Sequence, residues 1–467
     1  MGHTTRDRGH ETRDLATRIA WVVFLAACAK GGTPSIELGE SAVLSAPTAV
    51  GTAPMVAVGP GGAQAVAWVS APNGGTDGRL YVTVNGGPPA EIRDSLGPVQ
   101  AHGEAPPKIA FGPNGALYAV YTVGREVAGE RFPLSALRII TSNDNGKRWT
   151  SPVTVTDGVV FGSHSFHALH VAPNGDVYVS WLGKPEHDAT MAASAPMAEM
   201  KMASMQHGDP HAAHGASTSW ITRSTDGGRT WSPRARVDMG EACPCCRTSL
   251  ATAADGSLYM AWRHIYPGSI RDVVVARSND QGATWSEPVR VHEDDWKFDA
   301  CPHAGPAIAT DARGTLHVTW WTGKEGNAGV FYAQSADCGH SFSQPIALGI
   351  AQYSRPAHVQ LSLADSNRVI VVWDDGTKQT PRVVARVSND GGLHFGDAVP
   401  FSDLGRAASF PVLAVTHDSI TVAWSEESEA VARKAEADAK NAKDPKAPKG
   451  LEAVGQAQVL VRRGVLR

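Results

Sequence analysis

The stretch SNDQGATW, residues 278–285, recurs four more times with the same order of side chains, as SNDNGKRW (142–149), STDGGRTW (224–231), SADCGHSF (335–342) and SNDGGLHF (388–395). An apolar or β-branched run precedes each serine and a run rich in proline and valine follows each aromatic residue, which predicts a hairpin turn. Serine and aspartate side chains can accept hydrogen bonds from N–H groups of the turn, and glycine takes the positive-φ position. We therefore expect five equivalent turns with structural aspartates at Asp144, Asp226, Asp280, Asp337 and Asp390.

A second repeated pattern predicts the number of sheets. Apolar strands that end in an aromatic residue recur about every fifty residues, a spacing typical of propeller blades. A strand and a tight turn precede each of them, and a third strand, usually the Ser-Asp turn and a fourth strand follow. The aromatic residues are Trp68, Tyr121, Trp181, Trp262, Trp320, Trp373 and Trp424. The pattern predicts an all-β protein, a seven-bladed β-propeller whose blades are four-stranded antiparallel sheets with strands A to D.

The two ends of the propeller are expected to meet in one blade. The first blade has Asn85-Gly86-Gly87 in place of a Ser-Asp turn, and the last blade ends with its third strand, residues 458–463. The opening strand, residues 41–45, has no partner of its own. We predict that it supplies the missing fourth strand, which closes the ring and removes both open sheet edges. The propeller would then span residues 41–467, with insertions at about 185–217 and 426–452.

The five Ser-Asp turns resemble the Asp box, or BNR repeat, of sialidases and their relatives. Five copies make the resemblance to the sialidase superfamily specific, and it covers essentially the whole chain after the N-terminal segment. The resemblance implies a β-propeller, and six blades is the alternative to seven because sialidases have six. It does not by itself imply an enzyme, because a folding motif is shared by catalysts and binding proteins.

The N-terminal segment has a residue pattern unlike that of the rest of the chain. Arginines up to Arg18 precede the apolar run 19–27, which is too short to span a bilayer and is typical of a signal-peptide core. The sequence Leu-Ala-Ala-Cys that ends at Cys28 resembles the bacterial lipobox, which implies cleavage before Cys28 and a diacylglycerol on its sulfur. The alternative is an ordinary signal peptide with an incidental cysteine.

We therefore expect a signal peptide at residues 1–27 and a lipidated tether at residues 28–40. The mature protein would be an exported lipoprotein of the cell envelope, held to a membrane on the periplasmic side or at the cell surface. That location lies outside the reducing cytosol.

The up-and-down strand order places the loops of each blade on two rims. The A–B and C–D turns, which include the Asp boxes, share one rim. The B–C and D–A connections share the other rim, where neighbouring blades converge on the central axis. Cys28 would carry lipid and Cys338 belongs to an Asp box, so the remaining four cysteines are expected together on the second rim.

These four cysteines precede the A strands of two neighbouring blades. EACPCCRTSL holds Cys243, Cys245 and Cys246 before the fourth blade, and FDACPHAGPAI holds Cys301 and His303 before the fifth. One interpretation is one or two disulfides that tie adjacent connections in an oxidising compartment. The other is a metal site of thiolates with His303 and with His164 or His167 of HSFHALH, although the Cys-Pro-Cys-Cys spacing matches no standard zinc pattern.

The insertion at 185–217 is rich in methionine and histidine. Thioether and imidazole groups together select soft copper, and the insertion resembles the Met/His tracts of bacterial periplasmic copper-handling proteins. The alternative is a low-complexity loop without a ligand. The candidate donors are His187, Met191, Met197, Met200, Met202, Met205, His207, His211 and His214. The insertion at 426–452 is an Ala/Lys/Glu tract, which indicates a solvated helix or a disordered loop.

The resemblance to sialidases also indicates which residues would form a catalytic site if the protein were an enzyme. Sialidases hold a substrate carboxylate with three arginines, and Arg247 stands where the first is expected, although Thr-Ser replaces the Ile-Pro of the sialidase motif. Arg355 and Arg406 also precede A strands, so a three-arginine clamp is geometrically feasible. Rim arginines more often pair with local carboxylates. Candidates for the acid and for the Tyr–Glu nucleophile pair, none in a recognisable motif, are Asp272, Asp299, Tyr266, Tyr353 and Glu241.

The connection HEDDW, residues 292–296, is a further candidate. Its carboxylates could serve glycoside chemistry or bind calcium. The alternative is a solvated acidic loop.

Composition narrows the remaining choices. The 467 residues include 42% hydrophobic residues and 48 glycines, enough for a large core with many turns. The net charge of −4 gives no indication of a nucleic-acid partner. We predict a monomeric, non-hydrolytic binding module whose rim binds metal, with copper expected, through blades three to five. The alternatives are an exo-α-sialidase-type glycosidase that binds a glycan and a disulfide-stabilised scaffold for a protein partner.

Overall fold

Seven four-stranded antiparallel sheets make up the computed structural model of the protein in the residues that it describes. These residues are 1–2, 36–46, 49–72, 77–127, 133–156, 158, 160–184, 217–238, 240–350, 356–376, 380–430 and 457–467. The sheets all lie in the unit Pro34–Arg467. The prediction of an all-β, seven-bladed propeller is confirmed, and the six-bladed alternative is wrong.

The first four blades follow one another along the chain, each with its strands in sequential order. Their strands are β2 (Ala49–Val58), β3 (Gln64–Pro72), β4 (Arg79–Val84) and β5 (Ala90–Ile92); β6 (Lys108–Phe111), β7 (Leu117–Arg125), β8 (Leu134–Ser142) and β9 (Val153–Thr154); β10 (Ser165–Val171), β11 (Val177–Gly183), β12 (Thr218–Ser224) and β13 (Ala235–Arg236); and β14 (Ser249–Thr252), β15 (Leu258–Tyr266), β16 (Ile270–Ser278) and β17 (Val289–Arg290).

The last three blades continue the pattern, and the seventh also contains the first strand of the chain. Their strands are β18 (Ala307–Thr310), β19 (Leu316–Thr322), β20 (Gly329–Ser335) and β21 (Ile346–Ile350); β22 (Gln360–Leu363), β23 (Val369–Asp375), β24 (Arg382–Ser388) and β25 (Val399–Pro400); and β26 (Arg406–Val415), β27 (Ser419–Ser428), β28 (Gln458–Leu466) and β1 (Ile36–Val43).

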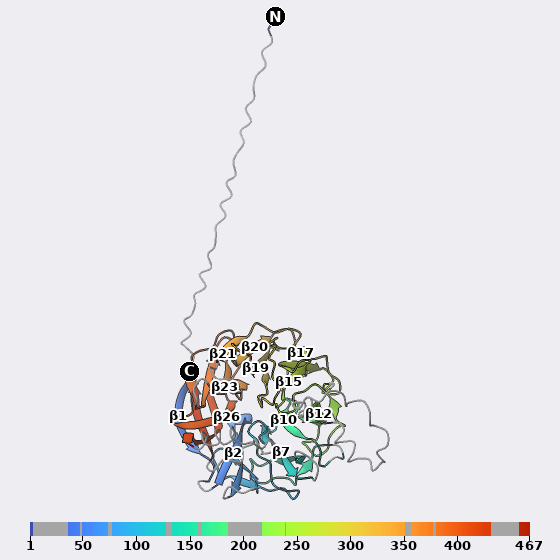
Figure 1. Cartoon of the computed structure of the whole chain (residues 1–467), viewed down its shortest axis with the longest axis vertical. Helices are drawn as coiled ribbons and strands as arrows, with labels where there is room; N and C mark the ends of the chain where they lie inside the picture. The colour runs from blue at the N-terminus through green and yellow to red at the C-terminus, as the bar shows by residue number, and fades with distance from the viewer. Residues whose placement is uncertain are drawn as a thin grey trace. The chain divides into compact units, whose positions relative to one another are not determined.

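The A strands of neighbouring blades contact one another around a closed ring. The contacts run from β2 to β6, β10, β14, β18, β22 and β26 and back to β2. Figure 1 shows this order as a colour sequence around the ring, with the blue β1 beside the red strands of the last blade. The D–A connections that join successive blades therefore all return to the inner strands.

The ring is closed by the pairing of the two ends of the propeller. Strand β1 pairs antiparallel with β28, with Ser41 opposite Arg462 and Val43 opposite Leu460. This is the predicted closure, although β1 begins at Ile36, earlier than the strand expected from the sequence. Because each blade is then complete, the ring has no gap that would leave an inner sheet edge unpaired.

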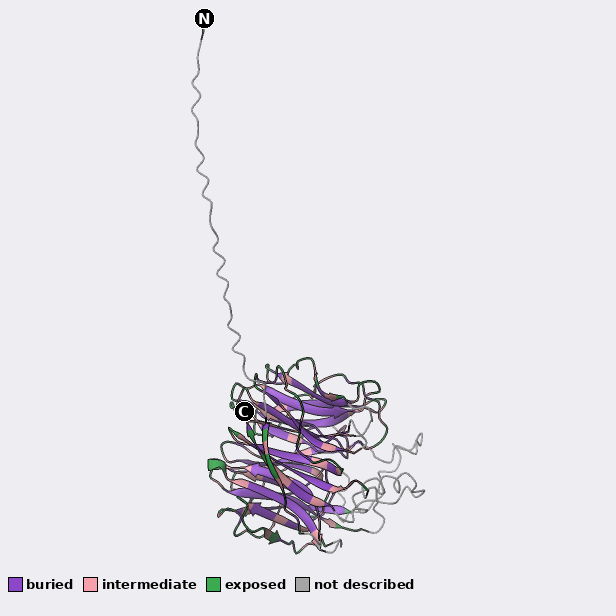
Figure 2. Ribbon diagram, turned by 90° about the vertical axis from the view of Figure 1, so that its left-hand side faces the viewer, coloured by how far each residue is buried: buried purple, intermediate pink, exposed green. Residues whose placement is uncertain are grey.

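The core lies between the faces of adjacent blades. The B strands are the most completely buried; every residue of β11 and of β19 is buried, and Figure 2 shows the strands in purple and the exposed residues at turns and edges. The aromatic residues that ended the repeated strands of the sequence, such as Trp181 and Trp262, are fully buried in the interfaces between blades. Burial of these large side chains stabilises the stacking of one blade on the next.

Each Asp box is held by its own side chains, as in the copy that follows β16. The Ser278 hydroxyl accepts the N–H of Gly282 at 2.8 Å and donates to Asp280 Oδ1 at 2.8 Å. Asp280 in turn accepts the backbone N–H and the hydroxyl of Thr284. Gly282 has a φ of 90°, as predicted, and Trp285 packs against the core. The five aspartates are therefore structural residues of the turns.

Several predictions from the sequence fall on residues outside the described ranges. These are the signal peptide, the lipid attachment at Cys28, the Met/His insertion and most of the Ala/Lys/Glu tract. In the ranges that the structure does describe, no helix has the length and apolar character needed to cross a bilayer.

Acid is expected to destabilise the propeller through its Asp boxes. Hydrogen bonds from Thr284 lower the pKa of Asp280 to about 2, and those from Arg148 do the same for Asp144. A carboxyl group with a lowered folded-state pKa contributes stability above its unfolded pKa, and this contribution is lost as the pH falls through the folded-state pKa. The thermal unfolding midpoint should therefore fall between about pH 4 and pH 2. The fall should be smaller in Asp280→Asn, and an identical pH dependence in this variant and the parent would contradict the assigned role.

Candidate metal centre

A segment of the first D–A connection, residues 102–107, reaches the middle of the ring; we call it the axial segment. The Glu104 carboxylate accepts a hydrogen bond from Arg247 Nη1 at 2.5 Å and another from the backbone N–H of Gly305. Arg247 also donates to the carbonyl of Val359. Both charged side chains of the ion pair are buried, with 0% of Glu104 and 6% of Arg247 exposed. One carboxylate thus ties the second blade to the fourth and fifth, and through Arg247 to the sixth.

The seventh blade completes the packing around the axial segment. A Cβ atom on Gly103 would lie 2.5 Å from the ring of Phe410, so this close approach requires glycine. Phe410 lies within a bulge of β26 and has a φ of 55°, a strained conformation for a phenylalanine. Its ring also packs on His358, whose Nδ1 lies 2.6 Å from Asp374. The middle of this rim is therefore filled by side chains from four blades and by the backbone of a fifth.

The arginines expected to clamp a carboxylate already have carboxylate partners where the structure describes them. Arg247 is paired with Glu104 on the axis, and Arg406 at the start of β26 forms an ion pair with the buried Glu426. Arg355 and Tyr353 lie outside the described residues. Tyr266 packs against the guanidinium of Arg290, which lies 3.9 Å from the ring centre. In this arrangement the positive charges of Arg247 and Arg406 neutralise the protein's own carboxylates.

Four cysteines and one histidine gather beside the axial segment. The Cys243 sulfur lies 3.6 Å from that of Cys245 and 3.4 Å from that of Cys246, and all three residues are buried. The donor atoms of these three lie within 4.8 Å of one another, and so do those of Cys245, Cys301 and His303. No disulfide joins the cysteines in the described ranges. The structure thus brings together the five residues that the sequence placed before neighbouring A strands.

Backbone hydrogen bonds hold the Cys-Pro-Cys-Cys turn against the end of β15. The Cys243 N–H donates to the carbonyl of Arg263, and the Ile265 N–H donates to the carbonyl of Glu241. On the facing connection, His303 has a φ of 51°, and the bond from Gly305 to Glu104 follows two residues later. The Cys-Pro-Cys-Cys turn is therefore held by β15, and the facing connection is held by the axial segment.

Two buried arginines give the thiols a positive surrounding. Arg271 Nη1 donates a hydrogen bond to the Cys243 sulfur at 3.0 Å, and the charge of Arg263 acts on Cys246. Burial by itself raises the pKa of the Cys243 thiol, but hydrogen bonds from Cys245 and Cys246 and the charge of Arg271 outweigh it and bring this pKa well below its usual value. Burial raises the pKa of Cys245 and of Cys246. The hydrogen bond from Arg271 thus favours the thiolate form of Cys243, and thiolate is the form that binds metal.

His164 and His167 lie apart from the cluster. His164 Nδ1 is 2.8 Å from the carbonyl of Ser135, and its ring packs edge-on against Trp181. His167 Nε2 is 3.3 Å from the carbonyl of Val120, and burial lowers the pKa of His167 to about 3. Neither belongs to the two donor groups. Both rings therefore lie between the second and third blades, where their nitrogens face the carbonyls of β8 and β7.

A histidine that the sequence analysis did not select lies next to the donors. The His102 ring centre is 5.4 Å from that of His303 and 5.4 Å from that of Phe166, and its Nδ1 accepts the N–H of Glu104. Burial, followed by the charge of His303, lowers the pKa of His102 to about 3, so the ring is neutral. The sequence could have indicated His102 through its position, because His102 precedes an A strand just as Cys243 and Cys301 do.

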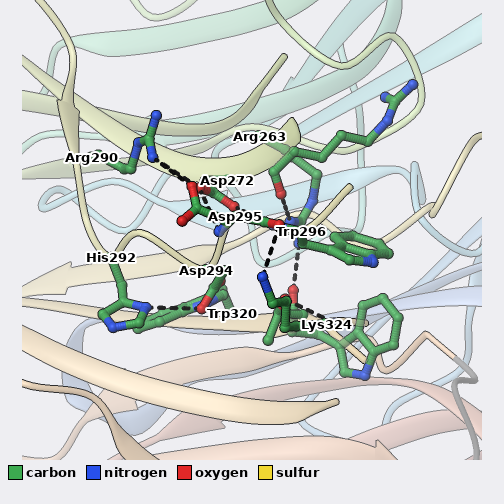
Figure 3. Close-up of polar contacts among 12 residues, drawn as sticks. Arg263, Asp272, Arg290, His292, Asp294, Asp295, Trp296, Trp320 and Lys324 are labelled. Carbon is green, nitrogen blue, oxygen red and sulfur yellow. Dashed lines mark hydrogen bonds and ion pairs between the residues drawn. The ribbon is translucent and has the colours of Figure 1, made fainter. Parts of the chain in front are cut away.

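The acidic connection after β17 is internally paired, as Figure 3 shows. Asp294 accepts the indole N–H of Trp320 at 2.7 Å and lies 2.9 Å from His292 Nδ1. Asp272 is buried, faces Arg290 and accepts the N–H groups of Asp295 and Trp296. Burial, followed by the charge of Asp294, raises the pKa of Asp272. These contacts use the carboxylates of Asp272 and Asp294 to fix the connection between the fourth and fifth blades.

A comparison with protein families identifies the propeller. The model of the BNR repeat-like domain matches residues 100–288 and 200–418. The chain belongs to this BNR family. No curated protein matched the sequence.

Solved structures share the fold of this BNR protein at low sequence identity. A protein of unknown function from Dyadobacter fermentans is 15% identical with a TM-score of 0.50, and the match covers 92% of this chain and 99% of that one. An ulvan lyase of polysaccharide lyase family PL25, bound to -[GlcA(1-4)Rha3S]-, is 13% identical with a TM-score of 0.51, covering 82% and 93%. A NanB sialidase variant from Streptococcus pneumoniae is 11% identical with a TM-score of 0.49, covering 93% and 98%.

Removal of the axial carboxylate is expected to destabilise the BNR propeller. Glu104→Gln keeps the size of the side chain but leaves the buried Arg247 charge without its partner, which costs about 3–5 kcal/mol. The free energy of unfolding in urea should fall by this amount. Asp77→Asn, which breaks an exposed ion pair with Arg79, is the control and should change it by less than about 1 kcal/mol. Equal effects of the two substitutions would contradict the role of Glu104.

Proposed function

We propose that this protein is a metal-binding module that holds soft monovalent copper through Cys243, Cys245 and Cys246. The observation that carries the proposal is the set of three buried sulfurs within 4.8 Å of one another, with the Arg271 guanidinium donating to one of them. Thiolates are soft ligands that select Cu(I), zinc and iron–sulfur clusters. Three sulfur donors placed so closely match the needs of a soft cation better than those of a hydrolase.

The charges around the cluster favour a monovalent ion over a divalent one. Arg263 and Arg271 are both buried, and within the described part of the chain neither forms an ion pair with a carboxylate. Three thiolates and one Cu(I) ion carry a net charge of minus two, which the two guanidinium groups balance. A divalent ion would leave an uncompensated positive charge in a buried site, which is costly.

The geometry gives less support to a glycosidase. A sialidase-type site needs arginines that are free to bind a substrate carboxylate, but the guanidinium of Arg247 is paired with Glu104 and that of Arg406 with Glu426. The resemblance to sialidases and to an ulvan lyase concerns the propeller, and a propeller can carry unrelated functions. A glycan-related function is therefore the second candidate.

The cellular setting of the proposal rests on the sequence. An exported lipoprotein anchored through Cys28 would present the cluster at the cell envelope, in a monomeric protein. The Met/His insertion, a B–C connection, would lie on the same rim and supply further copper ligands, among them Met197, Met200, Met202, Met205, His207, His211 and His214. Such flexible thioether ligands would suit the delivery of copper to the thiolates.

Copper binding by the full chain provides the test. The thiol-reduced protein is loaded with Cu(I) under anaerobic conditions, and its affinity is measured by competition with a chromogenic Cu(I) chelator. Cys243→Ser and Cys246→Ser should each weaken the tightest binding by at least about tenfold, because each removes one ligand of a three-ligand site. Cys338→Ser, at an Asp box, is the control and should bind as the parent does. Absence of Cu(I) binding, or equal affinity in all variants, would refute the proposal.

A further inference from the structure

We infer that the cluster holds two copper ions rather than one, with the Cys245 thiolate bridging them. This inference rests on the proposed function and extends it. The inner ion would be bound by Cys243, Cys245 and Cys246, and the outer ion by Cys245, Cys301 and His303. Such a centre takes up a pair of soft monovalent ions.

The separation of the donor atoms carries the inference. Each trio lies within 4.8 Å, but the five donors do not form a single set within that distance, and the two trios share only Cys245. An ion with metal–sulfur bonds of about 2.3 Å can join sulfurs no farther apart than about 4.6 Å. A single ion therefore fits one trio or the other, whereas two ions use all five donors. A thiolate sulfur retains lone pairs after it binds one ion, so it can bind a second.

The shared residue occupies the position that a bridge requires. Cys245 lies 3.6 Å from Cys243 within its own connection, and it also interacts with Cys301 across the interface between the fourth and fifth blades. In a trigonal site with bonds of this length the sulfurs are about 4 Å apart. Binding of the inner ion would therefore require the contacts of 3.4 and 3.6 Å to lengthen only slightly.

The charge balance also permits a second monovalent ion. The outer ion would bring one further thiolate, that of Cys301, and one further positive charge. The net charge of the filled cluster would thus remain minus two, still matched by the buried guanidinium groups of Arg263 and Arg271. A divalent ion at the outer position would upset this balance.

Burial distinguishes the two ions. Cys243 and Cys246 are each 1% exposed, whereas Cys301 and His303 are only partly buried. The outer ion would therefore exchange with solvent first, and the inner ion would leave through the position vacated by the outer one. The axial segment holds the outer ligands in place, because Glu104 binds the backbone of Gly305 and the His102 ring lies beside that of His303.

The test combines copper content with X-ray absorption. The full chain is studied with the methionines of residues 185–217 replaced by leucine, so that the insertion does not contribute thioether-bound copper. After Cu(I) loading and removal of weakly held copper with a chelator, we expect two copper ions per chain and a short copper–copper scattering path. Chelator release should be biphasic, with the outer ion leaving first.

Variants separate the two positions. Cys301→Ser should lower the content to one ion and abolish both the fast release phase and the copper–copper path. Cys245→Ser should abolish the copper–copper path, and Cys338→Ser should change nothing. A parent that holds one ion, shows no copper–copper path and is unaffected by Cys301→Ser would refute the bridged pair and leave the proposed function standing. A parent that holds no copper would refute both.

Discussion

The ion pair between Glu104 and Arg247 lies at the point where the blades of this propeller meet. It is buried and spans from the second blade to the fourth, and Glu104 also holds the backbone of the fifth blade two residues beyond His303. Arg247 directly follows Cys246 in the chain. This charge-assisted contact thus links the two connections that carry the cysteines, and backbone hydrogen bonds to β15 also hold the Cys-Pro-Cys-Cys turn. A buried pair of this kind contributes modestly to stability but specifies one arrangement, because each partner would be costly to leave alone.

The antiparallel order of strands explains why chemistry gathers on one rim. The Asp boxes use their serines and aspartates to hold C–D turns, so those residues serve the fold. The D–A connections carry no repeated turn motif of this kind, and their sequences differ from blade to blade. In this chain they supply thiols, imidazoles and the axial segment, whereas the arginines that would mark a carboxylate-binding propeller are paired with Glu104 and Glu426. Membership of the BNR family thus describes the scaffold, and the connections determine what is bound.

Much of the fold could be predicted because its signals are local. The Asp boxes, the B-strand tryptophans and the orphan strand before β2 each follow from short patterns that repeat with one period. The meeting of Cys243, Cys245, Cys246, Cys301 and His303 also followed from strand order, since neighbouring D–A connections must converge. The positions of His164 and His167 could not be predicted in the same way, because their rings face the carbonyls of Ser135 and Val120, which lie in the preceding blade. Glu104 and Arg271 were missed because their partners Arg247 and Cys243 belong to other segments of the chain, and nothing in a single sequence marks such a pair.

The central claim is that buried cysteines beside two guanidinium groups form a soft-metal centre on the D–A rim. A crystal structure of the reduced, Cu(I)-loaded protein, with anomalous difference maps recorded on either side of the copper absorption edge, tests it most directly. The account predicts copper peaks among the sulfurs of Cys243, Cys245 and Cys246 and between Cys245, Cys301 and His303. Disulfides among these cysteines, or copper found only elsewhere in the molecule, would contradict it.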